Sequence, residues 1–170
     1  LMPSDAGKLI KTLKKTVKVP VQLHSHCTSG VAPMTYLKAV EAGCDGIDTA
    51  LSPLAMGTSQ PATEVMYKTL QAAGVKVKLN EGSMAVATDY FRDYRRRVEK
   101  NGMLDVKMMD VDTDTLRYQV PGGMLSNLYS QMKEQHMEER FEEVLKEVPR
   151  VREDLGEPPL VTPSSQIVGT

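Results

Sequence analysis

Two of the three histidines in this chain lie two positions apart, in the segment Leu23-His24-Ser25-His26. An apolar run over residues 19–23 precedes them and has the pattern of a buried β-strand. Side chains two positions apart in a strand point to the same face, so the two imidazoles are expected to converge. Neutral imidazoles are good ligands for borderline divalent cations such as zinc, manganese or cobalt. The spacing therefore predicts that His24 and His26 bind a metal, with two ordinary polar residues at the end of a sheet as the alternative.

The two cysteines are weaker candidates for chemistry. Cys27 follows His26 directly, so in a continuing strand it would point to the opposite face, although a thiolate there could bind metal. Cys44 follows a glycine that ends a predicted helix and is expected to be a small buried residue. Two cysteines make no disulfide framework and suit a reducing cytoplasm. The third histidine, His136, lies in a charged helical segment and is expected to be inert.

The composition is typical of a globular protein, with 41% hydrophobic and 25% charged residues. A formal net charge of −1 gives no electrostatic argument for binding nucleic acid or an anionic membrane surface. We expect neither a membrane span nor a signal peptide, because no apolar stretch is long enough. A chain of 170 residues suffices for one core but not for two full domains.

Helical and strand patterns alternate through the first half of the chain. A helix that Ser4 or Asp5 could cap comes first, and strands are expected over residues 19–24 and 45–50, with helices over 32–42 and 61–73. This order predicts β/α units around a parallel sheet. Two strands cannot complete such a sheet, so they look like the last units of a larger barrel, whose sites lie at the carboxyl ends of the strands. The chain therefore reads as a piece of a longer protein.

The second half is expected to be mostly helical. A long charged helix over residues 84–100 comes first, and its arginine triplet at 95–97 is expected on a solvated face rather than against nucleic acid. Further helices are predicted from about Met124 and around Leu145. Thr162 followed by Pro163 is typical of a helix start.

Six segments of the chain, in order, resemble the carboxyltransferase domain of biotin-dependent enzymes. That family includes the oxaloacetate decarboxylase alpha subunit, pyruvate carboxylase with its separate B subunit, and the transcarboxylase large metal subunit. The segments cover residues 23–30, 38–43, 46–50, 57–61, 118–128 and 160–169. The resemblance thus spans nearly the whole chain, although Cys27 stands where many pyruvate carboxylases carry Asp, which leaves the subfamily open.

The resemblance implies an α/β fold made of the last β/α units of a TIM barrel, over residues 1–78, followed by a mostly α-helical funnel domain over 79–170. In the family an Asp, a carbamylated Lys and the two histidines hold a divalent metal. Only the histidines match here, as His24 and His26, so the other two ligands would lie before residue 1. The carrier domain with its biotinyl lysine has no counterpart in this sequence.

Two hydroxyl residues near the carboxyl end match family positions. Thr162 matches the catalytic threonine that moves a proton between biotin and the enolate of pyruvate, a task that suits a group able to donate and accept. Its alternative role is a simple helix cap. Ser165 lies one helical turn further on and would hydrogen-bond biotin by resemblance, with an ordinary helix serine as the alternative.

The resemblance implies a fragment of a cytoplasmic, biotin- and metal-dependent carboxyltransferase, of the oxaloacetate decarboxylase or pyruvate carboxylase type, and the isolated fragment is expected to be inactive. Expected partners are pyruvate or oxaloacetate, a biotin carboxyl carrier domain or subunit, further copies of the protein, and a membrane decarboxylase complex bound peripherally. One alternative is a metal-dependent aldol-type lyase or synthase of the related TIM family. The other is a non-catalytic interaction module.

Overall fold

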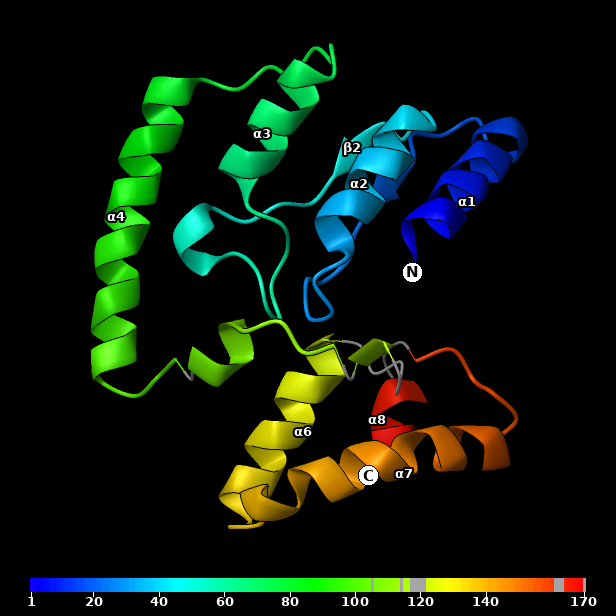
Figure 1. Cartoon of the computed structure of the whole chain (residues 1–170), viewed down its shortest axis with the longest axis vertical. Helices are drawn as coiled ribbons and strands as arrows, with labels where there is room; N and C mark the ends of the chain where they lie inside the picture. The colour runs from blue at the N-terminus through cyan, green and yellow to red at the C-terminus, as the bar shows by residue number, and fades with distance from the viewer. Residues whose placement is uncertain (105, 114, 117–121, 161–163, 170) are drawn as a thin grey trace. The chain divides into compact units, whose positions relative to one another are not determined.

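The computed structural model describes residues 1–104, 106–113, 115–116, 122–160 and 164–169 (Figure 1). The chain forms two compact units, Leu1–Val111 and Asp112–Thr170. The division between residues 1–78 and 79–170 rests on the family resemblance and stays a prediction. Among the described residues, no helix has the length and apolar character needed to cross a membrane.

The first unit contains the parallel strand pair. Strand β1 (Gln22–Leu23) pairs with β2 (Gly46–Ile47), with Gln22 opposite Gly46 and Leu23 opposite Ile47. Helices α1 (Pro3–Thr16), α2 (Ala32–Glu41), α3 (Thr63–Ala72) and α4 (Glu81–Lys100) and the short 3-10 helices η1 (Ser52–Leu54) and η2 (Val106–Met109) complete it. The unit is helix-rich α/β, and the expected order of helix, strand, helix, strand and helix is confirmed.

Both strands are shorter than predicted. Pro20 has no N–H for a ladder, and beyond Leu23 the Ser25 N–H donates to the Tyr36 hydroxyl instead of to a strand. Beyond β2 the chain turns away, and Ala50 forms a parallel bridge with Ala62. The ladder therefore ends after two residues in each strand.

Two helices begin earlier than predicted. Helix α1 starts at Pro3, since proline suits the first turn, where its missing N–H costs nothing, and neither Ser4 nor Asp5 is the cap. Helix α4 starts at Glu81 because the Asn80 side chain accepts a hydrogen bond from Ser83 N–H at 2.8 Å.

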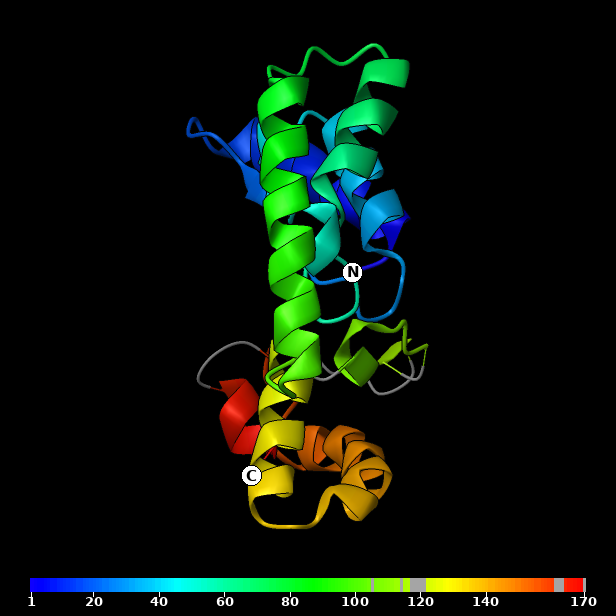
Figure 2. The ribbon, with the colours of Figure 1, turned by 90° about the vertical axis from the view of Figure 1, so that its left-hand side faces the viewer.

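The core of the first unit lies between α1, α2, α3 and the strand pair. Its buried residues are Ile10, Leu23, Tyr36, Ala39, Met66 and Leu70. Helix α4 is attached to α3 and η1 and runs beside them (Figure 2). Thr88 Oγ1 donates to Glu64 at 2.6 Å, and Arg95 donates to the Pro53 carbonyl at 2.8 Å. Core packing and these two hydrogen bonds stabilise the helices that surround the two strands.

The second unit is helical in all of its described residues that have regular structure. Its elements are α6 (Gly122–Glu134), η3 (Glu138–Arg140), α7 (Phe141–Asp154) and α8 (Ser164–Gly169), and residues 115–116 are helical too. Its core contains Met124, Leu125, Leu128, Met132, Leu145, Val148 and Val168. His136 lies outside α6, with a left-handed backbone (φ 56°) just after the helix ends, so its predicted helical position is wrong.

Candidate metal-binding site

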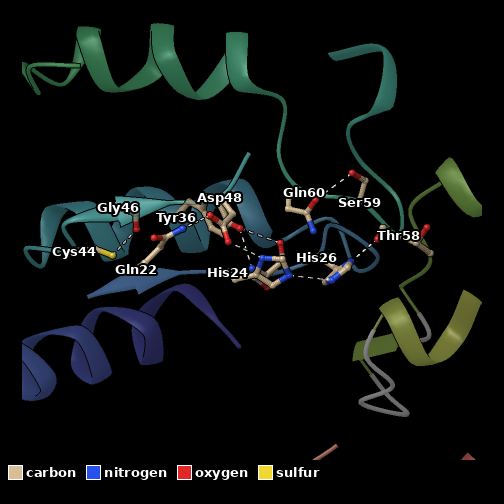
Figure 3. A network of polar contacts seen from close by, with 11 residues as sticks. Gln22, His24, His26, Tyr36, Cys44, Gly46, Asp48, Thr58, Ser59 and Gln60 are labelled. Carbon is tan, nitrogen blue, oxygen red and sulfur yellow. Dashed lines mark hydrogen bonds and ion pairs between the residues drawn. The ribbon is translucent and has the colours of Figure 1, made fainter. Parts of the chain in front are cut away.

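The strand register places the candidate site at the carboxyl ends of β1 and β2. Because Leu23 pairs with Ile47, the next residues, His24 and Asp48, lie at the same level. The Asp48 N–H donates to the Leu23 carbonyl at 3.0 Å, which closes the ladder at this edge. Figure 3 shows the polar side chains that converge there.

The His24 ring is oriented by a carboxylate. Its Nδ1 lies 2.8 Å from Asp48 Oδ2, and the Gln22 amide donates to Asp48 Oδ1. The hydrogen bonds from His24 and then Gln22 hold the pKa of Asp48 below its ordinary value, so Asp48 is an ionised acceptor. In the neutral ring His24 therefore carries its proton on Nδ1 and presents a lone pair on Nε2.

The His26 ring is oriented by a backbone carbonyl. Its Nδ1 contacts the Thr58 oxygen, which can only accept, so Nδ1 is the donor. Thr58 belongs to a tight loop over residues 56–60, in which Met56 N–H donates to the Gln60 carbonyl at 2.9 Å. Cys27 N–H donates to the Ser59 carbonyl at 2.8 Å and ties the histidine segment to that loop.

The two Nε2 atoms face each other at 3.3 Å (Figure 3). Both are acceptors in neutral rings, so their lone pairs repel unless a cation lies between them. Two nitrogens that share one metal ion through bonds of about 2.1 Å have this separation. A carboxylate and a carbonyl behind ligating histidines are the usual supports of such sites. The residues therefore fit a divalent metal, and the convergence expected for His24 and His26 is found.

The pair alone does not complete a metal site. Among the described residues, no group of three or more His, Cys, Asp or Glu side chains is arranged to hold a metal ion. The His24 side chain is 56% exposed, so further ligands can approach it. Cys27 is fully buried, and desolvation raises the pKa of its thiol to about 11. Cys44 donates to the carbonyls of Val21 and Gly46, at 3.2 and 3.1 Å.

Tyr36 holds the residue between the two histidines. Its hydroxyl accepts from Ser25 N–H at 2.9 Å and donates to the Ser25 carbonyl at 3.0 Å. Its side chain is fully buried, and the desolvation raises its pKa to about 12. The hydroxyl therefore stays protonated and able to donate at neutral pH.

The two hydroxyl residues predicted near the carboxyl end belong to the second unit. Thr162 lies outside the described residues. Ser165 lies in α8 and is 6% exposed, one helical turn before the buried Val168. Its predicted contact with biotin stays a prediction.

Asp48 and Tyr36 are not among the site residues predicted from the sequence. Asp48 had a usable signal, because it is the first polar residue after the second strand, as His24 is after the first. The carboxyl ends of parallel strands meet at one edge of a sheet, so the two could have been paired. Tyr36 had no such signal, since a tyrosine on the apolar side of a helix is usually a core residue.

Two family models match the chain. Residues 1–90 match the model described as HMGL-like, and residues 115–170 match a conserved carboxylase domain. The first contains the histidine pair and the second contains Thr162 and Ser165.

Individual relatives are similar in sequence to this chain over its whole length. The B subunit of pyruvate carboxylase from Methanocaldococcus jannaschii is 54% identical over 100% of this chain and 30% of its own length. The methylmalonyl-CoA carboxyltransferase 5S subunit of Propionibacterium freudenreichii subsp. shermanii is 42% identical over 100% of this chain and 33% of its own length. The chain thus spans about a third of the length of each of these two relatives.

Solved structures agree with these relatives. The carboxyl transferase domain of Rhizobium etli pyruvate carboxylase, determined with pyruvate and biocytin, superposes with a TM-score of 0.86 at 28% identity. The match covers 99% of this chain and 28% of that one. The resemblance to biotin-dependent carboxyltransferases is confirmed, and, since the first model covers more than half of its residues, the chain belongs to the HMGL-like family.

Proposed function

We propose that this chain is part of a biotin-dependent carboxyltransferase that moves a carboxyl group between oxaloacetate or pyruvate and carrier-bound biotin. The observation that carries the proposal is the facing pair of His24 and His26. Each Nδ1 atom is hydrogen-bonded, and the two Nε2 atoms lie 3.3 Å from each other. Relatives named as the B subunit of pyruvate carboxylase and as a carboxyltransferase subunit, similar along the whole chain, support it. The first unit then contributes the last β/α units of a TIM barrel, and the second contributes to a helical funnel.

In this proposal each residue at the site has a defined task. His24 and His26 hold a divalent cation (zinc, manganese or cobalt) through their Nε2 atoms. Asp48 and the Thr58 carbonyl keep the protons on the two Nδ1 atoms, so both lone pairs stay available. The cation supplies Lewis-acid stabilisation of negative charge on the oxygen of the substrate enolate.

Thr162 is the proposed proton carrier. A hydroxyl can donate one proton and accept another with little build-up of charge, which suits transfer between a ureido nitrogen and an enolate carbon. Ser165 is the proposed contact to biotin, which a carrier domain or subunit delivers. The isolated 170-residue chain is proposed to be inactive, because it spans only about 30% of the first relative.

The proton-transfer role is tested by Thr162→Ala in the complete protein that carries this sequence. The variant is expected to lose activity by about 10²–10⁴-fold, the usual contribution of a positioned proton carrier. The measurement is biotin-dependent decarboxylation of oxaloacetate, followed as pyruvate release. Thr162→Ser keeps the hydroxyl and should retain most of the rate.

Two outcomes would contradict this proposal. Wild-type activity in Thr162→Ala would reduce Thr162 to a helix cap. Oxaloacetate decarboxylation by the isolated chain, lost in Thr162→Ala, would show that residues 1–170 suffice for activity without further metal ligands.

The other functions considered have less support. An aldol-type lyase or synthase is not favoured, because residues 115–170 match a conserved carboxylase domain and relatives at 54% and 42% identity are a carboxylase and a carboxyltransferase subunit. Nothing about the facing histidines favours a non-catalytic interaction module. A homo-oligomer, a cytoplasmic location and peripheral binding to a membrane decarboxylase complex remain part of the proposal.

A further inference from the structure

The two histidines lie just beyond the end of strand β1, outside the hydrogen-bonded sheet. Strand β1 ends at Leu23, and the next backbone-to-backbone bond along the segment is that of Cys27 to Ser59. Within the described part of the chain, residues 24–26 have no backbone partner of their own. A segment without a ladder is free to twist, and twisting would separate the two imidazoles.

The Tyr36 side chain supplies the hydrogen bonds that a neighbouring strand would otherwise make to Ser25. The Tyr36 hydroxyl accepts from Ser25 N–H at 2.9 Å and donates to the Ser25 carbonyl at 3.0 Å. It thereby satisfies both backbone polar groups of the residue between His24 and His26, as a neighbouring strand would do. Because Ser25 joins the two histidines, holding its N–H and its carbonyl holds the backbone from which both imidazoles project.

The Tyr36 ring is enclosed by the core of the first unit. It is fully buried in α2 and packs in the core cluster with Ile10, Leu23 and Met66. A side chain locked by packing in a helix is a rigid support for a binding site. The hydroxyl position is therefore set by the core of the unit rather than by the site.

We propose that the Tyr36 hydroxyl is a positioning group that holds His24 and His26 at metal-binding separation. The inference rests on the proposed metal site and adds a residue that touches neither the metal nor the substrate. The competing view is that Tyr36 only fills the core and that its two hydrogen bonds contribute stability alone.

The test compares Tyr36→Phe with Tyr67→Phe in the complete protein. Each change removes a single hydroxyl from a tyrosine that is at most 6% exposed in the same unit. The Tyr67 hydroxyl accepts from the Gln71 amide at 2.8 Å within α3, away from the histidines. Tyr36→Phe removes both hydrogen bonds to the Ser25 backbone, whereas Tyr67→Phe removes the bond from Gln71 and leaves Ser25 untouched.

Two readouts are measured. The first is the affinity for Co²⁺, followed by visible absorption against a competing chelator, and it is expected to fall about 10-fold in Tyr36→Phe only. The second is amide hydrogen exchange of the peptide that contains Ser25, in the metal-free protein. Exchange there is expected to become at least ~10-fold faster in Tyr36→Phe, because the amide loses its acceptor.

The outcomes separate the two proposals. Wild-type cobalt affinity in Tyr36→Phe, or an equal loss in Tyr67→Phe, would overturn the positioning role while the metal site stands. If the wild-type protein binds no cobalt, the metal proposal fails, and amide hydrogen exchange alone tests the positioning role of Tyr36. Faster exchange confined to the Ser25 peptide in Tyr36→Phe would then support the positioning of the histidine segment. Unchanged exchange there, or faster exchange spread over the whole first unit, would overturn it.

Discussion

Asp45 and Asp48 lie on either side of strand β2, at opposite ends of the same strand pair. At the amino end Asp45 accepts from the Lys14 ammonium at 2.6 Å and from Val21 N–H at 2.7 Å. At the carboxyl end Asp48 accepts from His24 at 2.8 Å and from the Gln22 amide. In both cases these donors hold the pKa of the carboxyl below its ordinary value.

The difference lies in what each carboxylate holds. Asp45 connects α1 to the start of β1, so its bonds secure elements of the fold. Asp48 holds an imidazole whose other nitrogen faces a second imidazole, so its bonds orient a candidate ligand. A lowered pKa alone therefore does not distinguish a structural carboxylate from one at a functional site, but the identity of its partners does.

The largest effect expected from this comparison is on metal binding by Asp48→Asn. Removing the charge weakens the support of His24, and we expect the affinity for Co²⁺ in the complete protein to fall by about 10–100-fold. Asp45→Asn is the matched control, three residues away, and should leave the affinity unchanged. Equal losses in the two variants would show that the two ends do not differ in function.

A smaller effect is expected on stability, in the opposite order. Asp45→Asn removes the charge that pairs with Lys14, so its melting temperature should fall by a few degrees. The metal-free Asp48→Asn variant should melt closer to wild type. Calorimetry on the metal-free proteins makes the comparison, and a larger loss in Asp48→Asn would reverse our assignment of the structural role.

The smallest effect is the pH dependence of the Asp45 contribution. The pKa of Asp45 is lowered in the folded state by Lys14 and by Val21 N–H, so ionised Asp45 favours folding. That contribution is complete above the unfolded pKa of about 3.9 and is lost as the pH falls through the folded pKa. The difference in melting temperature between wild type and Asp45→Asn should therefore shrink below about pH 4. A difference that stays constant down to pH 2 would exclude a charge-based role.

The order of elements in the first unit and the meeting of His24 with His26 could be predicted from residue types and spacing. Alternation along residues 19–26 sufficed, because it depends only on local strand geometry. The strand lengths could not be predicted, since Ser25 N–H donates to the side chain of Tyr36 in helix α2. Whether an extended segment joins a ladder depends on tertiary partners, which propensity does not contain.

The supports of the histidine pair were less accessible to sequence reasoning. Asp48 is 24 residues from His24 and becomes its neighbour only through the strand register. The Thr58 oxygen is a backbone atom, which leaves no trace in residue type. Tyr36 reads as a core residue from its helical position, and its ring is indeed in the core. Its hydroxyl bonds the backbone of the site segment, and no periodicity in the sequence reports that contact.

The central claim is that His24 and His26 together hold one divalent cation. The most direct measurement is a cobalt titration of the complete protein, with the double variant His24→Ala/His26→Ala compared with wild type. His136→Ala is the control, because this third histidine is exposed in the other unit. We predict wild-type binding in His136→Ala and a loss of at least ~100-fold in the double variant. Unchanged cobalt affinity in the double variant would contradict the account.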